Sequence, residues 1–110
     1  MGATFVQDDD MIDYTPVADT LPGAVVVQND LIGVAKRLIP ANTLGSLAVE
    51  GIFDFPKSTA GGSAIGAGVT VYWNAAAQQA TTTSAGNKLI GKTTKAAADA
   101  DTTVRVRLQQ

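Results

Sequence analysis

The chain has 110 residues, enough for one domain or for one domain with a tail, and 45% of them are apolar. It contains no cysteine and no histidine, which excludes a disulfide framework, a thiolate nucleophile and a histidine general base. The formal net charge is −2 and only 16% of the residues are charged, which argues against a dedicated nucleic-acid-binding protein. No apolar run approaches the roughly 20 residues of a membrane-spanning helix and no signal-peptide pattern is present, so we expect synthesis in the cytoplasm and no membrane partner.

Residues 1–22 differ from the rest of the chain in charge and in proline content. Residues 7–10 are an acidic run, and Pro16 and Pro22 leave little room for a helix or a central strand. The sequence therefore predicts an extended N-terminal arm over residues 1–22 and a β domain over residues 23–110. A disordered tail is the alternative, because chain termini often fray.

Downstream of the arm, the sequence is typical of short strands. A β-branched run at residues 24–28 and an apolar run at residues 31–36 flank the turn-forming pair Asn29-Asp30, so we expect a hairpin. Residues 47–55 carry apolar side chains at most odd positions and charged ones on the other face, which predicts a single further strand.

The second half of the chain continues in the same way. Residues 69–73 have a clear strand pattern, and residues 81–83 and 88–94 are expected to pair as a second hairpin. Residues 102–108 alternate strictly, with two arginines on what we expect to be the wet face of an edge strand.

Helical propensity is confined to two alanine-rich segments, residues 75–80 and 96–100, which are too short to form stable helices alone. The predicted fold class is therefore all-β. We expect a small antiparallel β-barrel or sandwich of about seven short strands, with the extended arm at its N-terminus.

No catalytic or metal-binding constellation emerges from the sequence. On one strand, Glu50 and Asp54 would lie roughly 13 Å apart, too far for a glycosidase-type carboxylate pair. The acidic run lacks the glycine and the distal glutamate of a calcium-binding loop, and the glycine-rich residues 61–68 lack the lysine of a phosphate loop. We expect no enzyme activity, no cofactor, no metal and no small-molecule substrate.

Several strands are apolar on both faces, with residues 25–27 as the clearest case. An antiparallel sheet normally buries one face and leaves the other wet. A partner subunit would explain the second apolar face, and a closed barrel with local irregularities is the alternative.

A series of short motifs occurs in a characteristic order along nearly the whole chain. They are Asp13-Tyr14-Thr15-Pro16, Gly23-Ala24-Val25-Val26, Leu31-Ile32-Gly33-Val34-Ala35, Gly51-Ile52-Phe53-Asp54-Phe55-Pro56-Lys57, Gly68-Val69-Thr70-Val71-Tyr72-Trp73, Leu89-Ile90-Gly91 and Asp101-Thr102-Thr103-Val104-Arg105-Val106-Arg107-Leu108. In this order the chain resembles the small phage capsid cement, or decoration, proteins, once grouped as a family of unknown function.

The resemblance implies a structural virion protein. Such proteins bind the outer surface of an assembled bacteriophage head, commonly as homotrimers, and staple neighbouring capsid subunits together. The expected partners are therefore the major capsid protein and further copies of this chain, and the expected location is the outside of the virion after synthesis in the bacterial host cytoplasm. A non-enzymatic virion adaptor or a host-surface-binding module is the alternative function.

The resemblance supplies no catalytic or cofactor-binding residues, but it points to two contact regions. We expect the arm to reach a neighbouring subunit or the shell, and a second region around residues 53–56 to lie near a subunit contact. The candidate contact residues are Phe5, Val6, Ile12, Asp13, Tyr14, Thr15, Pro16, Phe53, Phe55 and Pro56.

Overall fold

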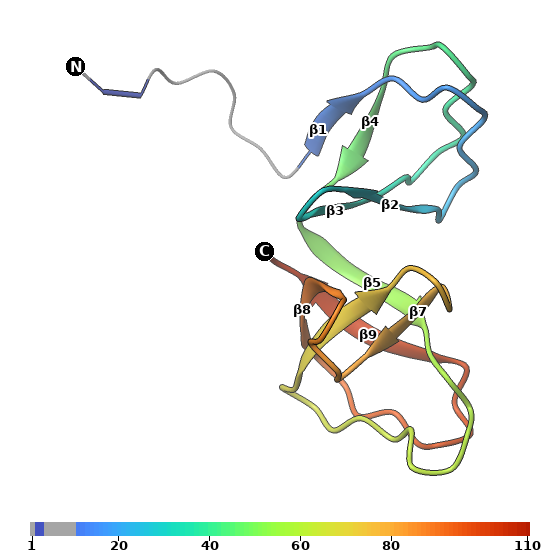
Figure 1. The fold of residues 1–110 in the computed structure, drawn as a ribbon, viewed down its shortest axis with the longest axis vertical. Helices are drawn as coiled ribbons and strands as arrows, with labels where there is room; N and C mark the ends of the chain where they lie inside the picture. The colour runs from blue at the N-terminus through green and yellow to red at the C-terminus, as the bar shows by residue number, and fades with distance from the viewer. Residues whose placement is uncertain (1, 4–10) are drawn as a thin grey trace.

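The computed structural model describes residues 2–3 and 11–110, and this part of the chain consists of strands, turns and loops without a helix. Two antiparallel sheets form an open sandwich rather than a closed barrel, which confirms the predicted all-β class (Figure 1). The strands are β1 (Met11–Tyr14), β2 (Val25–Gln28), β3 (Leu31–Val34), β4 (Gly45–Ala48), β5 (Gly51–Pro56), β6 (Thr70–Asn74), β7 (Gln79–Thr81), β8 (Lys88–Thr93) and β9 (Thr103–Leu108).

The first sheet has the strand order β1-β4-β3-β2. Strands β2 and β3 form the expected hairpin, with Val25 opposite Val34, and Asn29 in its turn has a φ of 56°. Strand β1 pairs along β4, from Met11 opposite Ala48 onward. The segment expected to be an extended arm therefore includes one edge strand that pairs within its own chain.

The second sheet has the strand order β5-β9-β8-β6-β7. The alternation predicted for residues 102–108 is confirmed in β9, because Val104, Val106 and Leu108 are buried and the two intervening arginines are exposed. The hairpin predicted between residues 81–83 and 88–94 is wrong, since β6 lies between β7 and β8. A turn after Asn74 brings the chain straight back along β6, so β7 occupies the outer edge.

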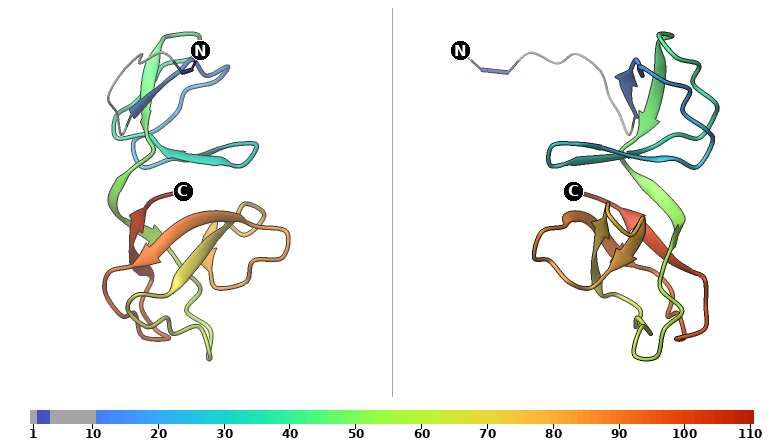
Figure 2. Two further views of the ribbon diagram at one scale, coloured as in Figure 1. Left: turned by 90° about the vertical axis from the view of Figure 1, so that its left-hand side faces the viewer. Right: turned by 45° about the vertical axis from the view of Figure 1, so that its right-hand side comes forward.

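The single strand predicted over residues 47–55 is also wrong, because the chain leaves one sheet and enters the other at this point (Figure 2). Leu47 is buried in the first sheet's core, whereas Phe55 belongs to the core of the second sheet. Gly51 begins β5 with a φ of 130°, a conformation that side chains other than glycine rarely adopt. Glu50 precedes β5, so it does not share a strand with Asp54.

Two hydrophobic cores lie on opposite sides of the β2–β3 hairpin. The large core collects buried side chains from both sheets, and Val25 and Val27 pack against it from the hairpin. The small core contains Ala35, Ile39 and Leu47, and Val26 packs against it from the hairpin's other face. The two apolar faces of residues 25–27 are therefore explained within one chain, and the partner subunit inferred for them is not needed.

Two polar contacts tie the hairpin to the second sheet. The Gln110 side chain accepts a hydrogen bond from the Ile32 amide at 2.5 Å and donates one to the Ile32 carbonyl at 2.7 Å. At the hairpin's turn, Lys88 Nζ lies 2.7 Å from Asp30 Oδ1. The hairpin is thus fixed to the second sheet at its edge and at its tip.

One lysine is buried where β5 ends. The side chain of Lys57 is only 4% exposed, and its ammonium group is surrounded by oxygen atoms of two loops. Nζ donates to the carbonyl oxygens of Ser58 at 2.7 Å, Ala98 at 2.9 Å and Asp101 at 3.1 Å, with the Asp99 carbonyl at 3.2 Å. Because no carboxylate oxygen is among these contacts, Lys57 acts as a hydrogen-bond hub that joins residues 57–63 to residues 98–101.

Candidate interaction surface

The part of the chain that the structure describes offers no arrangement typical of catalysis or of a metal site. Within it, no three side chains of the His, Cys, Asp and Glu types gather where they could hold an ion. None of its elements is a helix long and apolar enough to cross a membrane. The candidate functional sites are therefore the surfaces that the fold leaves open.

The predicted contact residues of the arm lie in different environments. Phe5 and Val6 lie outside the described residues. Ile12 and Tyr14 are half-buried, because both pack against the small core from β1. Asp13 points to solvent between them.

The next two predicted residues follow β1 directly. Thr15 is exposed, whereas Pro16 is buried and accepts a hydrogen bond from the Asn42 amide at 2.7 Å. Of the four residues 13–16, only Asp13 and Thr15 therefore present exposed side chains in a single chain.

The second predicted contact region, residues 53–56, also contains both buried and exposed side chains. Phe55 is 1% exposed and packs edge-to-face against Trp73, with ring centroids 6.1 Å apart. Phe53 is half-buried beside the large core, and Pro56 is exposed. Phe55 is buried in the core and cannot touch a partner directly, whereas the large aliphatic side chain of Ile52 on the same strand is 60% exposed.

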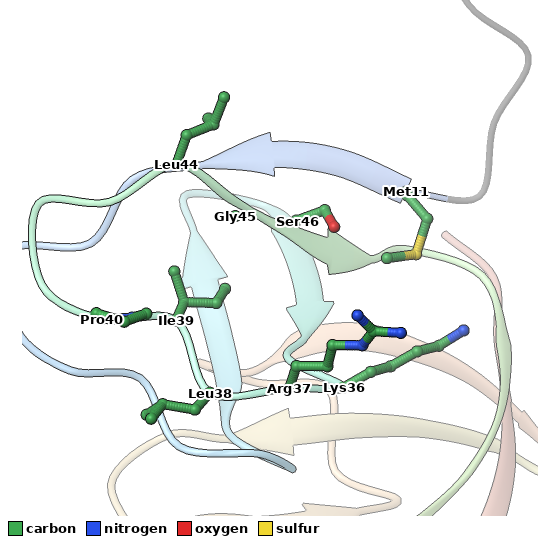
Figure 3. Close-up of a pocket in the computed structure, with 9 residues that line it drawn as sticks. All are labelled: Met11, Lys36, Arg37, Leu38, Ile39, Pro40, Leu44, Gly45 and Ser46. Carbon is green, nitrogen blue, oxygen red and sulfur yellow. The ribbon is translucent and has the colours of Figure 1, made fainter.

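A groove that the sequence did not predict lies on the first sheet (Figure 3). It has a volume of about 530 Å³. Figure 3 shows Leu38, Pro40 and Leu44 at one end, and the side chains of Lys36 and Arg37 extending toward the other. The remaining lining residues are Met11, Ile39, Gly45 and Ser46.

Large apolar side chains are exposed on two loops of the first sheet, and two of them, Leu38 and Leu44, line the groove. Val17 is 91% exposed, Leu44 67%, Leu21 66% and Leu38 50%. We call these four residues the loop surface. Clusters of exposed apolar side chains on soluble proteins often mark contact sites with other proteins. The signal in the sequence was the presence of leucines on both sides of the turn at residues 40–43, where polar residues are usual.

Hydrogen bonds hold the two loops that carry the loop surface against each other. Thr20 and Ile39 exchange backbone hydrogen bonds of 2.9 and 2.8 Å. The Asp19 carboxylate accepts a further hydrogen bond from the Ala41 amide at 2.8 Å. The exposed apolar side chains are therefore carried on loops that are braced by backbone contacts.

The outer face of the second sheet is more strongly charged. Arg105 Nε lies 3.0 Å from Asp54 Oδ1, and this hydrogen bond lowers the pKa of the Asp54 carboxyl below its ordinary value. A hollow of about 510 Å³ elsewhere on the second sheet is lined in part by Tyr72, Leu89 and Lys92. The exposure expected for Arg105 and Arg107 is confirmed, but the expected edge strand is wrong, because β9 lies between β5 and β8 in the sheet.

These features define a small β-sandwich domain that carries exposed apolar side chains on two loops of its first sheet. The model of the phage cement protein family matches residues 6–108, nearly the whole chain, and the chain belongs to that family. Its place is therefore the virion capsid, in a structural role. No curated protein and no solved structure was found to match the chain.

Proposed function

We propose that the chain binds the outer surface of an assembled bacteriophage head and joins neighbouring subunits of the major capsid protein. The family match over residues 6–108, which takes in both sheets and both cores, is the observation that carries this proposal. The loop surface supports it, because apolar side chains of this size favour burial against another protein. We further propose that the protein is made in the host cytoplasm and has no enzymatic activity.

We also propose that the protein acts as a homotrimer. Several weak contacts on one shell reinforce one another, since the first attached copy raises the effective concentration of the next contact. A rigid domain suits this mode of binding, because little conformational entropy is lost when braced loops meet a partner. The hydrogen bonds between residues 16–20 and 39–42 provide such bracing.

The test uses heads of the parent phage from which this protein is absent. Purified full-length protein is added at increasing concentration, the heads are sedimented, and the bound fraction is measured. We expect saturable binding and, by cryo-electron microscopy, density grouped in threes on the outside of the shell. Binding to the tail alone, or no binding to heads at all, would contradict the proposal and favour the adaptor function.

A pair of variants tests whether the loop surface makes the contact. Leu44→Asp places a charge on the loop surface, and Ile52→Asp places the same charge at a similarly exposed site on the second sheet. We expect Leu44→Asp to weaken head binding at least tenfold, about 1.4 kcal/mol, and Ile52→Asp to change it less than twofold. Equal effects would show that the loop surface has no special role.

A further inference from the structure

The groove on the first sheet combines apolar and cationic walls in a defined order (Figure 3). Leu38 and Leu44 form the apolar end, and Lys36 and Arg37 form the cationic end, near Met11. The two ion pairs found among the described residues, on β8 and β9, involve neither of these cations. The groove therefore suits a ligand that is apolar at one end and anionic at the other.

The chain itself contains a segment with this pattern. Phe5 and Val6 are apolar, and the three carboxylates of residues 8–10 follow after a single glutamine. Carboxylates gain from lysine and arginine partners at short range, especially when one side of the pair is shielded from water. We propose that residues 5–10 of one copy bind in the groove of a neighbouring copy, with the phenylalanine and valine at the apolar end.

A neighbouring copy fits better than the chain's own segment for two reasons. The groove runs from Met11 toward Leu44, alongside β1, so the residues before Met11 would have to reverse direction to enter the groove of their own chain. Residues 1–10 can span roughly 33 Å when extended, which is enough to reach an adjacent molecule of this size. A second copy would also cover part of the loop surface, which a six-residue segment is too small to do.

This inference depends on the proposed function in one respect, namely that copies of the chain lie next to one another on the head. The direct test replaces Phe5 in the full-length chain with a photoreactive benzoylphenylalanine. Equal amounts of isotopically heavy and light chains are mixed, irradiated in solution and on decorated heads, and digested for mass spectrometry. We expect crosslinks between heavy and light chains that end within residues 36–46.

Charge reversal tests the cationic end. The double variant K36E/R37E should lower the yield of interchain crosslinks at least fivefold, and adding D8K/D9K should restore most of it. The matched control is K92E/R107E, because these residues are also one lysine and one arginine, lie opposite each other on β8 and β9, and are exposed. We expect the control to stay within twofold of the parent chain, and circular dichroism to show that all variants are folded.

Three outcomes would overturn the inference. Crosslinks within one chain would place the segment in its own groove. Crosslinks to the major capsid protein would show that the segment binds the shell. The absence of crosslinks within residues 36–46 would show that the segment does not bind the groove. None of these outcomes contradicts the proposed function as long as the heads are still decorated. Loss of decoration in every variant and in the parent chain would contradict the proposed function instead.

Discussion

The buried lysine at the end of β5 allows a quantitative test of the fold. Lys57→Met keeps the length and the apolar stem of the side chain but removes the ammonium group. Three of its acceptors, the carbonyls of Ser58, Ala98 and Asp101, lie at 2.7 to 3.1 Å. Hydrogen bonds to a charged group contribute about 1.5–3 kcal/mol each.

The net loss is smaller than the sum of these bonds. Burying an ammonium group costs several kcal/mol of desolvation free energy, and the methionine variant no longer has this penalty. The freed carbonyls belong to loops whose residues 98–101 are exposed, so water can replace part of what is lost. We therefore expect Lys57→Met to lower the free energy of unfolding by about 2–4 kcal/mol, and the melting temperature by roughly 10–20 °C.

Urea unfolding followed by tryptophan fluorescence measures this change. Trp73 is the chain's single tryptophan, and it lies opposite Ala80, which in turn bridges to Lys57. The control, Lys92→Met, removes an exposed ammonium group and should stay within about 0.5 kcal/mol of the parent chain. A Lys57→Met variant as stable as this control would refute the role of the ammonium group as a hub.

Three further predictions follow from the structure. A Cβ atom at Gly91 would lie 1.9 Å from a backbone oxygen of β9, so Gly91→Ala should destabilise by about 3 kcal/mol or more, whereas Gly61→Ala, in open space, should have little effect in the same urea assay. Asp54→Asn should lower stability slightly at pH 7. Because the folded carboxyl has a lowered pKa, the difference should disappear as the pH falls below about 4, and equal midpoints at pH 7 would show that the pair contributes nothing. Removing residues 1–10 should leave thermal melting unchanged but weaken head binding at least tenfold, whereas removing residues 1–16 should also lower the melting temperature, because β1 packs on the small core.

Local patterns in the sequence predicted much of the secondary structure. The hairpin around Asn29 was predictable because its turn residue tolerates a positive φ and both flanking runs are β-branched or apolar. The C-terminal strand was predictable because its alternation is strict over residues 103–108. The pairing partner in the hairpin and the burial pattern in the C-terminal strand both depend on residues that are close in sequence.

The remaining features depend on contacts between distant residues. Nothing local distinguishes Leu47 from Phe55, although they belong to different cores, so the break before Gly51 could not be predicted from alternation alone. Lys57 reads as a solvent-exposed charge until residues 98–101 fold around it. The same holds for the groove, which exists only because β1 and β4 bring residues 36–46 beside Met11.

The β2–β3 hairpin explains how a sheet with so small a core can present a firm surface. The small core has three fully buried side chains, too few to stabilise a sheet of this size alone. Its hairpin also buries Ile32 and Val34 in the large core, and Gln110 holds its edge. The hairpin therefore links the first sheet, which carries the loop surface, to the second sheet. This arrangement suits a cement protein, because loops on a well-supported sheet lose little conformational entropy when they bind a partner.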